Sequence, residues 1–157
     1  MAKWIWKRGE NRANTWMCFV KDFSCEAVLD TALVKIAADT KYWLFINGKT
    51  VLLEGGLKRG LTPASTYYDV LDIAGNIKKG TNRIALLVWF FGKDGFSHVS
   101  CGRGGIYLDS DWGLETDESW KAKRNEAYIT LSEGEERPNF RLPESDVCFD
   151  ASLDSGD

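Results

Sequence analysis

The stretch that decides the fold is Tyr42-Trp43-Leu44-Phe45-Ile46-Asn47-Gly48-Lys49-Thr50-Val51-Leu52-Leu53. Its two halves, 42–46 and 49–53, are rich in the aromatic and branched residues that favour strands. Between them stands Asn47-Gly48, and both of these residues tolerate the positive φ that a two-residue hairpin turn requires. The stretch therefore predicts an antiparallel hairpin.

Upstream of this hairpin the chain is also β-prone. The run Trp16–Val20 predicts a strand within 14–23, and a turn is expected near Asp22–Ser24. From Cys25 onward a loose alternation of apolar residues changes phase and continues to Ala38. We expect one long bent strand there.

Downstream of the hairpin, turn-forming residues separate further strands. Tyr67–Ile73 is expected as a strand, and Asn76–Asn82 as a turn. Arg83–Phe91 is apolar on both faces, which predicts a central strand. The remaining expectations are a strand at Ile106–Leu108, short edge strands at Ser119–Ala122 and Ala127–Ile129, and a solvated loop at Glu133–Pro138.

Short strands divided by turn signals, without a helical period, are typical of a two-layer β protein. We therefore predict an all-β fold, an antiparallel jelly-roll β-sandwich. Residues 1–157 are long enough to form a single domain with its own core.

Two long glycine-rich loops, Glu54–Thr66 and Gly92–Gly105, interrupt this pattern. Loops of such length are usually functional or disordered, and sandwich loops gather at the ends of the sheets. We expect a carbohydrate-binding or domain-contact surface there, with Lys58 and Arg59 as additional polar partners. Its candidate residues are Tyr67, Tyr68, Asp69, Phe91, Asp94, Phe96, His98 and Arg103. The alternative is that the aromatic residues pin the loops to the core.

Composition narrows the classes of partner. The chain holds 7 Trp, 5 Tyr and 8 Phe, whose rings can pack in a core or stack on sugars. A net charge of −3 argues against a nucleic acid partner. The longest apolar run, Ile84–Phe91, is too short to cross a bilayer as a helix, so no membrane partner is expected.

Residues that could carry catalysis are sparse. His98 is the only histidine, in a loop where we expect it to be exposed, and no G-x-S-x-G motif occurs. Two acids on facing elements could still form a glycosidase pair, although most acids here are expected to form turns or caps. The candidate acids are Asp69, Asp72, Asp94, Asp109 and Asp111. We expect no catalytic centre.

Metal, cofactor and phosphate sites are not expected either. The cysteines, Cys18, Cys25, Cys101 and Cys148, are widely separated and form no zinc-binding pair, although disulfides stay possible in an exported protein. The segment 102–105, Gly-Arg-Gly-Gly, lacks the Lys-Ser/Thr of a phosphate loop. Its glycines are expected to let the loop lie close to a neighbouring backbone.

Several of these stretches together resemble a known domain. The stretch 38–49, the run Tyr67-Tyr68-Asp69 and Lys79–Ala85 resemble the galactose-binding-like jelly-roll that precedes the catalytic barrel in bacterial alpha-L-rhamnosidases. The stretch Trp89–His98, the opening Trp4-Ile5-Trp6 and Ser119-Trp120-Lys121 narrow the resemblance to the rhamnosidase-like group.

The resemblance implies a non-catalytic accessory domain that packs against a catalytic barrel and contributes loops to substrate binding. Enzymes of this group carry their acids on a large helical barrel, so the implied partners are a downstream catalytic domain of the same parent chain and rhamnose-containing glycans. The chain would then be a fragment of a multidomain glycoside hydrolase, periplasmic or extracellular. The alternative is an autonomous carbohydrate-binding module.

Overall fold

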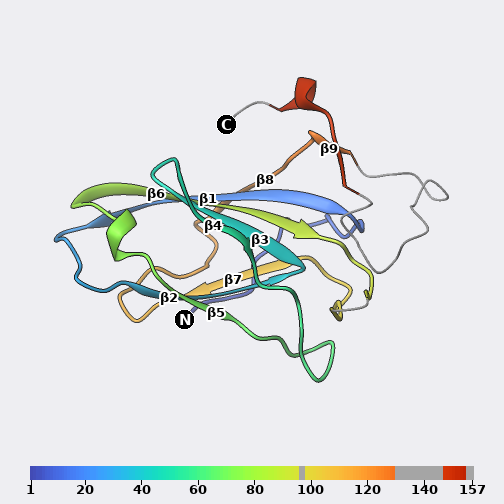
Figure 1. Cartoon of the computed structure of the whole chain (residues 1–157), viewed down its shortest axis with the longest axis horizontal. Helices are drawn as coiled ribbons and strands as arrows, with labels where there is room; N and C mark the ends of the chain where they lie inside the picture. The colour runs from blue at the N-terminus through green and yellow to red at the C-terminus, as the bar shows by residue number, and fades with distance from the viewer. Residues whose placement is uncertain (96–97, 130–146, 155–157) are drawn as a thin grey trace.

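The computed structural model describes residues 1–95, 98–129 and 147–154, and it consists of antiparallel β-sheets in two main layers (Figure 1). The large sheet has five strands in the order β4-β3-β6-β1-β8. Their bounds are β1 Thr15–Cys25, β3 Lys41–Ile46, β4 Lys49–Gly55, β6 Gly80–Phe90 and β8 Lys121–Arg124. The predicted antiparallel jelly-roll sandwich is confirmed.

The second layer is a three-stranded sheet in the order β5-β2-β7, which lies below the large sheet in Figure 1. Its strands are β2 Leu33–Asp39, β5 Asp69–Asp72 and β7 Gly105–Asp109. A two-stranded ladder of β9 Tyr128–Ile129 and β10 Cys148–Phe149 lies on the outer side of the large sheet, and short 3₁₀ turns occupy 74–76 and 151–153.

The core lies between the two layers because successive side chains of a strand point to opposite faces. On β6 this alternation buries Ile84, Leu86 and Val88, which meet β2 residues such as Ile36. β6 is the middle strand of its sheet, paired with both β1 and β3, as its apolar sequence predicts.

The hairpin of β3 and β4 is confirmed. Ile46 pairs with Lys49, and Asn47 and Gly48 both have positive φ, of 51° and 76°. The Asn47 side chain donates to the backbone oxygen of Asn76 and to Oδ1 of Asn82, each at 2.9 Å. The asparagines of the two sequence motifs thus hold each other at one end of the sandwich.

Three expected strand boundaries were wrong. No turn occurs at Asp22–Ser24, because β6 begins at Gly80 and pairs with β1 along its whole length to Cys25. The long bent strand expected from Cys25 is only β2, and the strand expected over Tyr67–Ile73 is only β5. β5 is short because it pairs only with Leu33–Ile36 of β2.

The expectations for the C-terminal part of the chain and for the cysteines have separate outcomes. The edge strand expected at Ser119–Ala122 is β8, shifted to Lys121–Arg124 and paired with β1 alone. The loop expected at Glu133–Pro138 lies outside the described residues. The four cysteines are all free. No helix among the described residues is long and apolar enough to span a bilayer.

Candidate carbohydrate site at the long-loop end

The two long loops lie side by side at the end of the sandwich opposite the Asn47-Gly48 hairpin (Figure 1). The amide of Val99 in the second loop donates to the carbonyl of Lys58 in the first, at 3.0 Å. The amide of Lys58 in turn donates to the carbonyl of Thr40, between β2 and β3, at 3.1 Å. The expectation that these loops meet at one end is confirmed.

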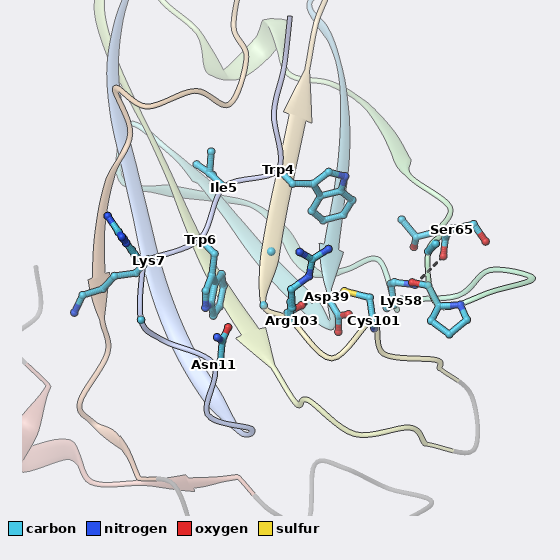
Figure 2. A pocket seen from close by; sticks show the side chains of 17 residues that line it. Trp4, Ile5, Trp6, Lys7, Asn11, Asp39, Lys58, Ser65, Cys101 and Arg103 are labelled. Atoms are coloured by element: carbon cyan, nitrogen blue, oxygen red, sulfur yellow. Dashed lines mark hydrogen bonds between the residues drawn. The ribbon is translucent and has the colours of Figure 1, made fainter.

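Beside the joined loops lies a hollow of about 470 Å³, shown in Figure 2. Three segments that are far apart in the sequence contribute to its lining: the N-terminal segment 4–11, the loop 58–66 and the loop 101–105. Asp39, the last residue of β2, completes it. We call this the loop-end hollow.

Two indole rings line one part of the loop-end hollow. Ile5 forms an antiparallel β-bridge with Ile106 of β7. Because side chains alternate along an extended segment, Trp4 and Trp6 lie on the same face of the N-terminal segment, opposite to Ile5. Trp6 packs on Phe19 and its ring N–H donates to the carbonyl of Glu10 at 2.6 Å. Trp4 is half exposed, at 50%, so an indole face is open to a ligand.

Glycines 104 and 105 let the second loop lie against these rings. A Cβ on Gly104 would lie 2.2 Å from Cε2 of Trp6, and one on Gly105 would lie 2.8 Å from Cε3 of Trp4. The glycines were expected to approach a neighbouring backbone, but it is the indole side chains that they approach. Any larger residue would push the rings out of the hollow.

Asp39 places a buried carboxylate in the lining, with 1% of its surface exposed. One of its oxygens accepts from the amide of Cys101 at 2.8 Å, and the hydroxyls of Ser100 and Thr40 donate to the carboxylate at 3.3 and 3.2 Å. These bonds satisfy a group that burial would otherwise penalise. They also anchor the second loop to the end of β2.

Two of the cations that line this hollow, Lys58 and Arg103, come from the two long loops. Lys58 is 3% exposed, and its ammonium donates to the carbonyls of Pro63 at 3.0 Å and Ser65 at 2.7 Å. Arg103 is exposed, and Figure 2 shows its side chain extending toward Trp4. A planar guanidinium beside an indole face can bind sugar hydroxyls or an anion while the ring stacks on the sugar.

Of the candidate residues named from the sequence, Arg103 lines the hollow, and two others stabilise the second loop. Asp94 accepts from the amide of Ser100 at 2.9 Å. His98, expected to be exposed, is only 3% exposed, and its Nε2 lies 2.8 Å from the carbonyl of Lys93. Because a carbonyl only accepts, Nε2 carries the proton.

Asp69, the first residue of β5, stabilises the first loop through its hydrogen bonds. Its Oδ2 accepts from the Tyr42 hydroxyl at 2.7 Å and from the amide of Gly56 at 2.8 Å. Burial, and then the hydrogen bond to Asp69, raise the pKa of Tyr42 well above its usual range, so the phenol stays a donor. Asp69 therefore holds the loop without lining the hollow.

The aromatic candidates lie elsewhere. Phe91 is buried in an outer cluster with Trp16 and Trp89, where it pins the chain to the sheet. Tyr67 and Tyr68 are exposed, and the Tyr68 ring lies 5.7 Å from the ammonium of Lys35 on β2. Phe96 lies outside the described residues.

Sequence reasoning missed Trp4, Trp6 and Asp39 as lining residues. The alternation Trp4-Ile5-Trp6 carries a usable signal, because two large rings on one face of an extended segment either close a core or form a platform. Asp39 carries none, because its position depends on contacts with residues 100 and 101, far along the chain.

Catalytic and metal chemistry find little support in this lining. Asp39 is its single carboxylate, whereas a glycosidase centre needs two. Within the described parts of the chain, no group of three or more His, Cys, Asp and Glu residues could hold a metal ion.

Comparison with known proteins agrees with the architecture. No protein-family model matches the chain. No curated protein matches it either. Among solved structures, a Pleurotus ostreatus lectin has 23% identity and a TM-score of 0.53, over 78% of this chain and 34% of the lectin. This likeness concerns the fold alone and agrees with the β-sandwich described above.

Two rhamnosidases make the likeness more specific. The GH78 family rhamnosidase of Bacillus sp. GL1 is 33% identical, with a TM-score of 0.71, over 82% of this chain and 14% of that chain. The alpha-L-rhamnosidase from Dictyoglumus thermophilum is 23% identical, with a TM-score of 0.56, over 79% and 16%. The chain resembles a sandwich domain of alpha-L-rhamnosidases, as its sequence motifs indicate. It spans only about 14–16% of the length of these two enzymes.

Proposed function

We propose that this chain is a non-catalytic accessory domain of an alpha-L-rhamnosidase-like glycoside hydrolase, and that its loop-end hollow binds a sugar of the glycan substrate. The observation that carries the proposal is the hollow itself, where the half-exposed Trp4 lies beside the guanidinium of Arg103. Open indole faces and convergent polar groups are the usual components of a sugar site.

Packing against a catalytic barrel is the second part of the proposal. The outer face of the small sheet carries two exposed apolar side chains at diagonal positions, Leu33 of β2 opposite Asp72 and Val70 of β5 opposite Lys35. Exposed apolar patches mark surfaces that another domain covers. The rhamnosidase likeness supports such a neighbour, because the matched part is a small share of those enzymes.

The test of this function combines activity with binding. The purified chain should leave aryl alpha-L-rhamnosides intact and should bind rhamnose-containing oligosaccharides, as followed by NMR titration of the tryptophan indole signals. Trp4→Ala should abolish this binding without unfolding the protein. Leu153→Ala, also at an exposed apolar position but outside the hollow, should leave binding unchanged. Rhamnoside hydrolysis by the chain, or a failure to bind any sugar, would contradict the proposal.

An autonomous carbohydrate-binding module is the second candidate, favoured by the likeness to the lectin fold. The two candidates differ at the outer face of the small sheet. If the chain is a lone module, Leu33 and Val70 face solvent in its native state, and Val70→Lys should change neither its self-association nor its sugar affinity. If the chain is an accessory domain, the uncovered face should cause self-association, and Val70→Lys should reduce it. Light scattering of the unmodified chain and of the Val70→Lys variant distinguishes these outcomes.

A further inference from the structure

The loop-end hollow is positively charged, although the protein as a whole carries a net charge of −3. Four of its lining residues are cationic, namely Lys7, Arg8, Lys58 and Arg103, and one is acidic, Asp39. Local charge of one sign in a concave surface attracts ligands of the opposite sign.

Asp39 does not offer a free carboxylate to a ligand. Its oxygens accept from the amide of Cys101 and from the hydroxyls of Ser100 and Thr40. Because protein donors occupy its oxygens, this carboxylate does not compete with a ligand for the cations, and the four cations of the lining outnumber its single negative charge. The cations therefore dominate the polar chemistry of the hollow.

The two central cations have no acidic partner among the residues that the structure describes. Lys58 is buried, and its ammonium, which has three hydrogens, donates to two backbone carbonyls. Burial of a charge without a counter-charge is costly, so a bound anion would relieve it. For Arg103 too, no described carboxylate forms an ion pair with the guanidinium.

A second hollow provides the internal comparison. It has a volume of about 640 Å³ and lies over β1 and β8, and it also contains several cations. There, however, Arg83 is paired with Asp22 at 2.7 Å and Arg124 with Glu126 at 3.7 Å, while Lys21 is paired with Asp117 at 3.1 Å. Three of the five cations that line that hollow are thus ion-paired. At the loop end Lys7 is paired with Glu10 at 3.7 Å, whereas Lys58 and Arg103 form no ion pair with a described residue.

We infer that the loop-end hollow is specific for a sugar that carries a carboxylate, a uronic acid residue of an acidic glycan. The sugar ring stacks on the open face of Trp4, and its carboxylate binds Arg103 and the remaining hydrogen of Lys58. An acidic side chain of a neighbouring protein surface would use the cations but not the indole face, so the sugar is favoured. This inference rests on the proposed carbohydrate-binding function and names its ligand class.

The test is an NMR titration of the labelled protein with methyl β-D-glucuronide and, separately, with methyl β-D-glucoside. We expect the acidic sugar to bind at least about tenfold more tightly, which is the value of one charge-assisted hydrogen bond. Its affinity should fall as salt is raised from 0.05 to 0.5 M, at roughly constant affinity for the neutral sugar, because ions screen exposed charges over about 10 Å at 0.1 M.

Two variants locate the effect. Arg103→Gln should weaken binding of the acidic sugar much more than binding of the neutral sugar, so that the two affinities become equal. Lys121→Gln removes the same charge in the second hollow and should change neither affinity. Circular dichroism of both variants checks that the fold is kept, which both exposed positions favour.

The outcomes separate the inference from the proposed function. Equal binding of the two sugars contradicts the inference and leaves the function in place. Binding of neither sugar, nor of any rhamnose-containing oligosaccharide, contradicts both. An acid preference that survives Arg103→Gln, or equal competition by sodium acetate, also contradicts the inference, because the site would then be elsewhere or unselective for sugars.

Discussion

The two ends of the sandwich differ in the length of their connections and in the contacts that stabilise them. At the hairpin end the connections are short, and the side chains of Asn47 and Asn82 bind each other and the backbone around them. At the loop-end hollow the connections are long, and Lys58, Asp39 and the two N-terminal indoles come together from separate segments. The hairpin end is stabilised by local hydrogen bonds, whereas the hollow depends on contacts between distant residues.

This difference indicates which end of the sandwich can bind a ligand. Asn82 is 1% exposed and its side-chain groups are satisfied within the protein, so this asparagine has little left to offer a ligand. The hollow keeps an exposed guanidinium and an open ring face. Substitutions should therefore cost mainly stability at the first end and mainly binding at the second.

The largest loss of stability is expected from Asn82→Ala at the hairpin end. The substitution removes the hydrogen-bond partners of the Asn47 amide group, of the Lys78 amide and carbonyl and of the Gly80 carbonyl. The free energy of unfolding should therefore fall by about 3 kcal/mol. Urea denaturation measures it. Thr81→Ala, at the exposed neighbouring position, is the control and should be nearly neutral. A small effect of Asn82→Ala would remove the contrast between the two ends.

At the hollow, Gly104→Val should lower the free energy of unfolding by about 2 kcal/mol, because the new side chain collides with the Trp6 ring. The same variant should lose sugar binding, since the ring must move. Thermal denaturation and NMR titration follow the two effects. Arg103→Ala, at the adjacent exposed residue, should lose affinity but keep its stability.

Gly48→Val tests the hairpin turn and should cost somewhat more than about 1 kcal/mol of unfolding free energy. A Cβ at Gly48 meets no atom within 4 Å, so the whole cost comes from its φ of 76°. Gly75→Val is the matched control at the same end, because Gly75 too has open space around it but no positive φ. Equal stabilities of the two variants in urea would contradict the proposed origin of the strain.

The smallest change of stability is expected from Trp4→Ala, within about 0.5 kcal/mol, because the ring is half exposed. Its effect should appear in sugar affinity alone, as measured by NMR titration. If this variant unfolds at a much lower temperature, Trp4 is a core residue and the hollow loses its platform.

The same contrast explains how far the sequence could predict the structure. The hairpin, the central strand β6 and the sandwich class follow from local signals, since Asn47-Gly48 and the alternation in Arg83–Phe91 act over a few residues. The ends of β1 and β5 could not be predicted, because a strand extends as far as its partner does.

The composition of the loop-end hollow could be predicted only in part. Loop length pointed to the end of the sandwich where this hollow lies, and Arg103 and Lys58 do line it. Asp69, Asp94 and His98 do not line the hollow but stabilise the loops, because each forms a hydrogen bond with a backbone group of a loop. Trp4 and Asp39 come from other segments, which no local pattern connects to the loops.

Lys58 also links the two loops to each other and to the end of β2. Its amide binds Thr40, its carbonyl binds Val99, and its ammonium holds the carbonyls of Pro63 and Ser65. One residue thus joins β2–β3 to both loops, so we expect the two loops to open together. The amides of Lys58 and Val99 should consequently exchange with solvent at the same rate, as a single cooperative unit. A ligand that contacts the ammonium would slow that exchange in both loops at once.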